Sequence, residues 1–301
     1  MIARYTGLRR HPAAFRALTG LTVPQFDALW VEVAPCLAEA ERKRLTRPTR
    51  KRQIGAGHPF ALAERDRVLL TVIWLRRYPI YEVLGLLFGI SQETAVRTVP
   101  RVLPILEAAG LDSMRRRDPG KYRRAHLDEL LRETPEIAVI VDSFEQRIER
   151  PTDQAVADTY YSGKKKQHTL KVQVAVDEGG GIVDIPPSVR GPTNDLELLR
   201  TSGLPERLGP EVGILGDLAY VGITAFHPTG ATPRRKPRSK PRPPEDRAFN
   251  TAFASRRVRV EHVIGRLRSF EALAQRDRHH RRFHTARSRA VAGLVNRRLA
   301  G

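Results

Sequence analysis

Apolar residues recur at helical spacing over much of the first third of the chain. Residues 14–40 carry such a stripe, and Thr22 and Pro24 occupy positions that commonly begin a helix. Residues 61–75 form a second apolar segment with the length and pattern of a buried helix. The N-terminal region is therefore predicted to be all-α.

A helix, a short turn and another helix are predicted next. An amphipathic helix over residues 80–88 ends at Gly89, and Ser91 then stands as the N-cap of the following helix. This pattern is typical of a helix-turn-helix, whose second helix reads bases in the major groove, and also of an ordinary helical hairpin. The residues expected to contact DNA bases are Gln92, Glu93, Thr94 and Arg97.

The periodicity changes from helical to strand-like beyond residue 135. Apolar or alternating runs predict strands over residues 137–142, 168–177, 182–185 and 211–217. Helical spacing predicts helices over residues 195–203 and 249–270, and the apolar stripe of the second is expected to face the sheet, at Phe253, Val260, Ile264 and Leu267. Strands that alternate with helices predict an α/β domain.

The charge of the chain indicates a polyanionic partner. Its 301 residues include 53 Lys and Arg against 33 Asp and Glu, a formal net charge of +20. Such a surplus favours nucleic acid. The apolar runs are far shorter than the ~18 residues of a membrane-spanning helix, and the N-terminus does not resemble a signal peptide. A cytoplasmic protein with no membrane partner is predicted.

Basic residues concentrate in a few segments. Residues 41–52 hold seven basic residues against Glu41 alone, which predicts an exposed arm that contacts phosphates, or a solvated linker. A Pro-rich stretch over residues 228–247 is also strongly basic. Further residues expected to grip the DNA backbone are Lys164, Lys165, Lys166 and His168.

Metal sites built on several cysteines are excluded, because Cys36 is the single cysteine of the chain. Any metal ion must therefore be held by oxygen or imidazole. The histidine cluster of His279, His280 and His284 lies in an Arg-rich run. We predict that it belongs to a phosphate-facing tail and is not a metal site.

Three carboxylates are the candidates for chemistry. Asp142 and Asp217 each close a predicted strand, where α/β folds place their sites, and Glu261 lies in the middle of the helix predicted over residues 249–270. Taken singly, each has an ordinary explanation as a turn former, a helix cap or the partner of Arg257. Together they suit two Mg²⁺ or Mn²⁺ ions about 3.5 to 4 Å apart, which cleave phosphodiester bonds.

Residues 137–270 resemble the DDE transposases of bacterial insertion sequences, in the branch that includes the PIF/Harbinger elements. The matching text runs VIVDSFEQRIERP, YYSGKKKQHTLKVQVAVD and GDLAYVG, followed by FNTAFASRRVRVEHVIGRLRSF. Residues 59–107 are similar to the helix-turn-helix that accompanies this domain. The resemblance implies an RNase H-like fold, a mixed sheet flanked by helices, with Asp142, Asp217 and Glu261 as its catalytic and metal-binding triad.

The chain also departs from the pattern of that family. Ala254 stands where a Tyr is common, and Arg268 replaces a Lys, although it keeps the charge that holds a phosphate. Asn194 replaces the His of a Gly-x-x-His-Asp motif, and we leave Asp195 outside the triad. Arg257 matches the family, and the resemblance implies that Arg257 and Arg268 orient Glu261 or contact the DNA.

Five segments are expected along the chain. They are a helical segment with a basic arm (residues 1–58), a helix-turn-helix DNA-binding domain (59–112), a basic linker (113–134), the RNase H-like domain with its basic insertion (135–275) and an Arg-rich C-terminal helix or tail (276–301).

We expect an insertion-sequence transposase that binds double-stranded DNA at terminal inverted repeats, cleaves the element ends and joins the freed 3′-OH to target DNA. Because both ends must be processed together, a homodimer or larger assembly is expected.

Two alternatives stay open. One is a non-catalytic DNA-binding regulator derived from a transposase, and the other is a nuclease of the same fold without strand transfer.

Overall fold

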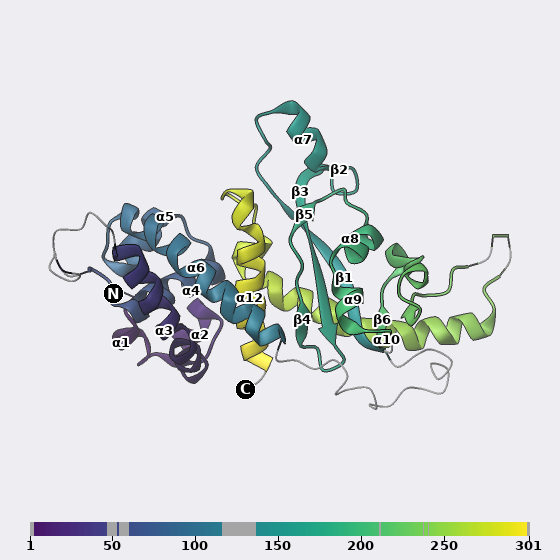
Figure 1. Ribbon diagram of the computed structural model, residues 1–301, viewed down its shortest axis with the longest axis horizontal. Helices are drawn as coiled ribbons and strands as arrows, with labels where there is room; N and C mark the ends of the chain where they lie inside the picture. Colours follow the sequence, from purple (N-terminus) through teal and green to yellow (C-terminus); the bar gives the residue numbers. More distant parts are fainter. Residues whose placement is uncertain are drawn as a thin grey trace.

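The computed structural model describes residues 3–46, 53, 60–115, 137–210, 212–236, 238–239 and 241–299. Figure 1 shows a helical part, formed by the N-terminal third of the chain, beside a part built on a twisted sheet. The C-terminal helix α12 (His284–Leu299) lies between the two parts. The long helix α10 (Pro244–Arg268) packs on the sheet and reaches α12.

The helical part begins as its apolar pattern predicts. The Thr22 hydroxyl accepts from the Gln25 backbone N–H at 3.3 Å, and the Gln25 side chain accepts from the Thr22 N–H at 3.0 Å. This reciprocal cap starts the third helix at Val23. The helices of this part are α1 (Tyr5–Leu8), α2 (Pro12–Thr19), α3 (Val23–Leu45), α4 (Glu64–Arg77), α5 (Tyr81–Phe88) and α6 (Gln92–Arg115).

The predicted start of the basic arm at residue 41 is wrong, because α3 continues to Leu45. Glu41 is buried there, and its carboxylate lies 2.7 Å from Arg44 and 3.4 Å from Arg67. The pair with Arg67 binds the last turns of α3 to α4. Residues 47–52 of the expected arm lie outside the described residues.

The turn between α5 and α6 has the predicted helix-turn-helix form. Gly89 ends α5 with a left-handed backbone (φ 58°), a conformation in which glycine has no steric penalty. The Ser91 hydroxyl accepts from the Thr94 backbone N–H at 3.3 Å and caps α6. A Cβ at Gly85 would meet the Ile90 carbonyl oxygen at 2.8 Å, so glycine lets the turn fold back on α5. The predicted helix pair is confirmed.

The remaining elements form the α/β part. Its strands are β1 (Ile137–Arg147), β2 (Tyr161–Ser162), β3 (Gln167–Asp177), β4 (Ile182–Asp184), β5 (Val189–Arg190), β6 (Gly213–Leu215) and β7 (Gly230–Ala231). Besides α10 and α12, its helices are α7 (Gln154–Tyr160), α8 (Asp195–Thr201), α9 (Leu204–Leu208) and α11 (Glu271–Ala274), with 3₁₀ turns η3 (Leu218–Tyr220), η4 (Ile223–Ala225) and η5 (Arg281–Phe283).

The sheet is mixed, with the strand path β2-β3-β1-β6-β7. β3 runs antiparallel to β1, whereas β6 and β7 run parallel to β1, and the short strands β4 and β5 also pair with β3. Helices pack on both faces, and this is the RNase H-like α/β architecture that the resemblance implies. Asp142 does not close its strand as predicted, because pairing of β1 with β3 continues to Arg147.

The two faces of the sheet hold separate apolar cores. Ile140 and Phe144 of β1 pack in the core that includes α10, whereas Val139 and Val141 face the core of α8 and α9. This alternation follows from the two-residue period of a strand. It places Asp142 on the α10 side. The stripe of α10 predicted to face the sheet is buried at Phe253, Val260 and Leu267 and half-buried at Ile264.

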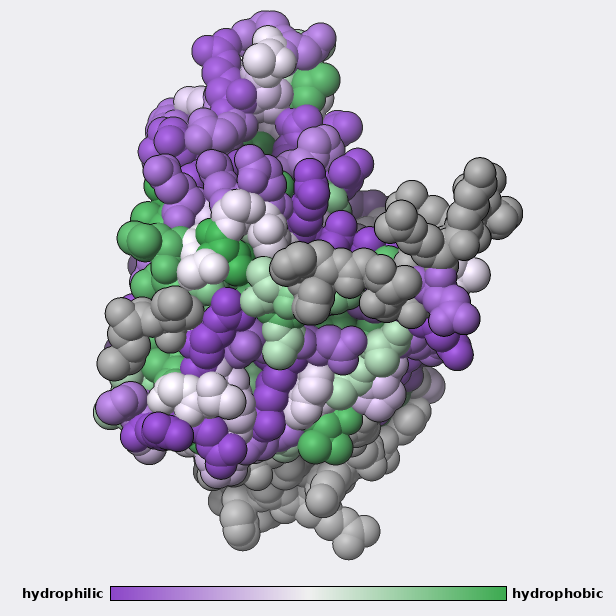
Figure 2. Space-filling model, turned by 90° about the vertical axis from the view of Figure 1, so that its left-hand side faces the viewer, coloured by the Kyte–Doolittle hydropathy of each residue, from purple (hydrophilic) through white to green (hydrophobic). Residues whose placement is uncertain are grey.

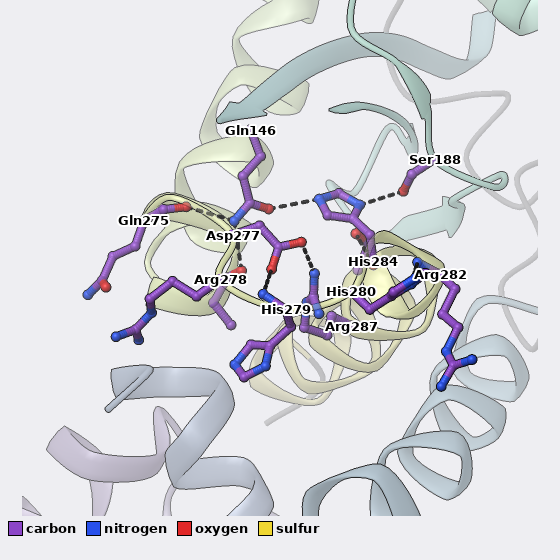
Figure 3. Close-up of polar contacts among 12 residues, drawn as sticks. Gln146, Ser188, Gln275, Asp277, Arg278, His279, His280, Arg282, His284 and Arg287 are labelled. Atoms are coloured by element: carbon purple, nitrogen blue, oxygen red, sulfur yellow. Dashed lines mark hydrogen bonds and ion pairs between the residues drawn. The ribbon is translucent and has the colours of Figure 1, made fainter. Parts of the chain in front are cut away.

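The C-terminal histidines join a buried polar cluster (Figure 3), so the predicted phosphate-facing tail is wrong for His279 and His284. His284 is fully buried, and its ring contacts Gln146 at 2.9 Å and Ser188 at 2.8 Å. His279 packs edge-on against the rings of Trp74, Tyr78 and Tyr81. The Arg-rich run predicted an exposed tail, but α12 packs between the sheet part and α6. This packing buries even Arg287 of α12.

The predicted segment boundaries stay predictions. Most of the expected linker, residues 116–134, lies outside the described residues, as does Lys240 of the basic insertion. Within that insertion β7 joins the sheet edge and α10 begins at Pro244. In the part of the chain that the structure describes, no helix is long and apolar enough to cross a membrane.

Candidate active site and DNA-binding surface

The Asp142 carboxylate is held at the candidate site by two polar contacts. It lies in mid-β1, and its Oδ1 accepts from the Ser143 backbone N–H at 2.7 Å. Its Oδ2 lies 3.2 Å from the Arg257 guanidinium. Burial raises the pKa of Asp142, and the nearby charge of Asp217 adds to the rise, while Ser143 and Arg257 lower it. The site therefore stabilises the charge of Asp142 incompletely, and a further cation would stabilise it.

Glu261 reaches the same site from α10, four residues beyond Arg257. The Arg257 nitrogen that contacts Asp142 lies 3.8 Å from the Glu261 carboxylate. The Glu261 side chain is 56% exposed, whereas those of Asp142 and Arg257 are 20% and 18% exposed. Glu261 is therefore free to change rotamer, and Arg257 is held between the two acids.

Asp217 follows β6, the strand next to β1 in the sheet. Its carboxylate accepts from the Ala219 backbone N–H at 2.8 Å and caps the turn η3. Because β6 runs parallel to β1, its end brings Asp217 within electrostatic range of Asp142. Asp217 therefore caps a turn, as one interpretation of the sequence predicts, and also lies at the predicted site.

The three acids have the ligand chemistry that a divalent cation prefers, but their carboxylates are not close enough together to hold one in this arrangement. Carboxylate oxygens are the ligands that Mg²⁺ and Mn²⁺ prefer. Within the described residues, however, no group of three His, Cys, Asp or Glu side chains is close enough to hold a metal ion. Arg257 occupies the position between Asp142 and Glu261 and supplies the positive charge there.

Two further polar residues, Asp195 and Tyr220, lie near the site. Neither was assigned a role from the sequence. The Asp195 carboxylate accepts from the Ser143 hydroxyl at 2.5 Å and lies 3.1 Å from the Lys171 ammonium. Tyr220 is fully buried, and its hydroxyl has no partner among the described residues. Burial raises the pKa of Tyr220, and the charges of Asp195, Asp142 and Asp217 raise it further. The sequence signal that could have pointed to Tyr220 is its place in the motif GDLAYVG, three residues after Asp217.

A basic pocket of about 500 Å³ opens beside these acids. It is lined by Lys164 and Lys165 from the turn before β3 and by Arg268 from the end of α10. Lys166 and His168 do not line it, although Lys166 is exposed nearby in the same turn. The pocket also contains residues without a predicted role, namely Arg147, Lys171 and Arg276.

The predicted base-reading residues lie at the start of α6. Gln92, Glu93 and Arg97 are exposed, and Thr94 is half-buried beneath the Ser91 cap. Figure 2 views the molecule from the side of these N-terminal helices, and that face is largely hydrophilic with small separated apolar areas. The exposed side chains of Gln92, Glu93 and Arg97 are therefore accessible to a polar partner.

An RNase H-like sheet with acids on two neighbouring strands, joined to a helix-turn-helix, is the architecture of an enzyme that acts on DNA. Residues 141–296 match the family model of the DDE superfamily endonuclease, and residues 60–111 match the helix-turn-helix of DDE superfamily endonuclease. The chain is also 30% identical over 287 residues to a "Probable transposase for insertion sequence element IS702" from Microchaete diplosiphon, covering 95% of this chain and 94% of that protein. No solved structure matches the chain.

The chain therefore belongs to the DDE superfamily endonucleases, among the transposases of insertion sequences. The family model for the endonuclease ends at residue 296, within α12, so most of the C-terminal helix belongs with the catalytic domain in that comparison.

Proposed function

We propose that this transposase binds the terminal inverted repeats of its element, hydrolyses phosphodiester bonds at the element ends and joins the freed 3′-OH to target DNA. The observation that carries the proposal is the contact of Arg257 with both Asp142 and Glu261, near Asp217, which follows the adjacent strand. Acids from β1 and α10, which are distant in the sequence, contact one cation there, and Asp217 lies within electrostatic range of Asp142.

Asp142, Asp217 and Glu261 are the residues that would hold Mg²⁺ or Mn²⁺, with two ions in each site. Bound ions would activate the attacking oxygen and stabilise the leaving oxygen of the phosphodiester. Asp142 is pre-positioned for this by its backbone contact with Ser143, and exposed Glu261 is the ligand that can move. Arg257 orients Glu261, or a phosphate of the DNA.

Double-stranded DNA is the proposed partner of two surfaces. Gln92, Glu93, Thr94 and Arg97 of α6 contact base edges in the major groove. On the catalytic side the residues that hold backbone phosphates are Lys164, Lys165, Lys166, His168 and Arg268. The large positive net charge supports binding of this kind, because each neutralised phosphate releases counterions.

We further propose that the protein acts as a homodimer or larger assembly in the cytoplasm, because two DNA ends must be brought together. Sedimentation of the DNA complex as one protein per duplex end would contradict this assembly. The regulator and the nuclease without strand transfer are the competing functions, and one experiment separates all three.

The test is Mg²⁺-dependent cleavage and joining on a duplex that carries the DNA flanking this gene, with wild type beside Asp142→Asn. We expect the variant to lose cleavage and joining and to keep DNA binding, because the amide cannot replace an anionic ligand. Asp112→Asn, an equal change at an exposed residue near the end of α6, is the matched control. Undiminished cutting by Asp142→Asn refutes the site, cutting without joining indicates the nuclease, and binding without cutting by wild type indicates the regulator.

A further inference from the structure

A second basic pocket lies in the helical part, away from the candidate active site. Its cavity of about 360 Å³ opens between α3, α4 and α6. Four arginines line it, Arg44 from α3, Arg67 from α4, and Arg97 and Arg101 from α6. Glu41 is the one acidic residue in its lining.

The positive charges of this arginine pocket are only partly balanced. Glu41 is shared by Arg44 and Arg67, with carboxylate contacts of 2.7 and 3.4 Å. Within the described residues, neither Arg97 nor Arg101 forms an ion pair or a hydrogen bond through its side chain with a carboxylate. Four arginines against one glutamate leave a local surplus of three positive charges.

The excess positive charge also shifts the pKa of an arginine in the pocket. Burial lowers the pKa of Arg101, and the charges of Arg44, Arg67 and Arg97 lower it further, whereas Glu41 raises it. The neighbouring segment, residues 46–60, contains no Asp or Glu that would balance the charge. Bringing like charges together costs free energy, which a bound anion would offset.

The chemistry of the lining selects a phosphate. Guanidinium groups offer planar pairs of N–H donors that match two phosphate oxygens, and hydroxyl groups add single contacts. Thr94 lies in the same lining, one helical turn before Thr98 and beside Arg97. Arg97 and Arg101 are four residues apart on α6, so they project from the same face of the helix.

The position of the pocket points to the phosphate of a DNA backbone. Its lining continues from the residues at the start of α6 that are proposed to read bases, Thr94 and Arg97. A helix in the major groove lies between two phosphate backbones, and contacts to them fix its register while base contacts supply specificity. A cluster of arginines beside such a helix is placed for that task.

We propose that the pocket of Arg44, Arg67, Arg97 and Arg101 binds one backbone phosphate of duplex DNA and thereby fixes the register of α6 in the major groove. The inference rests on the proposed function, in which α6 reads the element ends. Arg101 supplies the free donors, and Arg44 and Arg67 are held ready by Glu41. Arg97, which is proposed to contact bases, adds only its positive charge to the pocket.

The test is the salt dependence of DNA binding by Arg101→Gln. Affinity is measured for the element-end duplex and for an unrelated duplex of equal length, at several KCl concentrations. Arg101 is exposed and without an ion-pair partner among the described residues, so the variant is expected to fold as wild type. We expect affinity for both duplexes to fall about tenfold, as for loss of a charge-assisted hydrogen bond, and the salt slope to fall by about 1.

Arg10→Gln is the matched control, because it removes the same charge from an exposed arginine that lines none of the pockets described above. Arg101→Lys restores the charge without the paired donors, and should recover the salt slope but only part of the affinity. If Arg101→Gln keeps the affinity and slope of Arg10→Gln, the phosphate site is wrong. A loss confined to the element-end duplex with an unchanged slope also overturns it, because that result indicates a base contact.

The same measurements separate failure of this inference from failure of the proposed function. If wild type binds both duplexes equally, end recognition by α6 is wrong, yet a parallel loss with Arg101→Gln still supports the phosphate site. If wild type prefers the element end and Arg101→Gln behaves as the Arg10→Gln control, the proposed function stands and the phosphate site does not.

Discussion

At the scale of single residues, the buried polar groups divide into those that are fully paired and those that are not. Asp277 and Arg287 form a buried ion pair (Figure 3). Asp277 also accepts from the Tyr78 hydroxyl at 3.1 Å. Asp142 has a raised pKa, and Tyr220 has an unpartnered hydroxyl among the described residues. Asp142 and Tyr220 both lie at the candidate active site. Other buried atoms without a partner among the described residues, such as Trp74 Nε1 and two nitrogens of Arg287, lie elsewhere in the fold.

His284 shows how a paired group sets the pH dependence of stability. The Gln146 side-chain N–H donates to the carbonyls of Ala272 and Gln275, so its oxygen accepts from the His284 Nε2–H. The His284 Nδ1 then accepts from the Ser188 hydroxyl, which requires the neutral ring. Burial lowers the pKa of His284 to about 3, and the charge of Arg287 lowers it further.

We predict that His284→Asn weakens the loss of stability in acid. The unfolded chain binds a proton at this ring below its ordinary pKa of ~6.5, but the folded chain does so only near 3. Stability therefore falls as pH decreases through that window, by up to about 1.4 kcal/mol per pH unit. Guanidinium unfolding at pH 7, 6 and 5 should show a shallower slope for His284→Asn than for wild type. Exposed His262→Asn is the control, and equal slopes for all three would contradict the prediction.

At the scale of elements, α6 and α12 are in close backbone contact. A Cβ at Gly293 would lie 2.6 Å from the Gly110 Cα, and a Cβ at Gly110 would lie 2.2 Å from the Arg289 carbonyl oxygen. The two backbones touch where glycines face each other. This contact joins the second helix of the helix-turn-helix to the last helix of the α/β part.

We predict that Gly293→Ala destabilises the protein by about 1–3 kcal/mol, because its methyl group would force the two helices apart. Gly265→Ala on α10 is the matched control, since nothing lies within 4 Å of a Cβ there. That control should be neutral or stabilise by up to about 1 kcal/mol, the helix preference of alanine over glycine. Urea unfolding measures both, and a neutral Gly293→Ala would show that the helices have room to separate.

At the scale of the whole molecule, the helical part and one face of the sheet share one apolar core. This core includes Trp74 of α4, Leu103 of α6, Val174 of β3 and Val260 of α10. The polar cluster of Tyr78, Asp277 and Arg287 lies at the same junction. A shared core couples the helices of the helix-turn-helix to the strand that carries Asp142.

We predict that the two parts unfold in one transition. Both tryptophans of the chain, Trp30 and Trp74, lie in the helical part, so their fluorescence reports on that part, whereas far-UV circular dichroism reports on the whole chain. Because the core is continuous, the two signals should give the same denaturation midpoint, and Gly293→Ala should lower both together. Separate midpoints would show that the helical part unfolds independently.

The sequence by itself determined the elements and the type of chemistry. Spacing of apolar residues predicted the helix-turn-helix, the caps at Thr22 and Ser91, and the buried stripe of α10, because these depend on neighbours in the chain. The resemblance of residues 137–270 supplied the RNase H-like fold and the family, both confirmed. The three acids were also found there, and they remain a proposal.

Only the tertiary structure decided which polar groups face solvent and which face each other. The run around His284 reads as an exposed tail, yet packing of α12 between α6 and the sheet buries it. Arg257 between Asp142 and Glu261, and the four arginines around Glu41, join elements far apart in the sequence. Such groupings follow from the packing of helices on a sheet, and a local pattern carries no information about partners so distant along the chain.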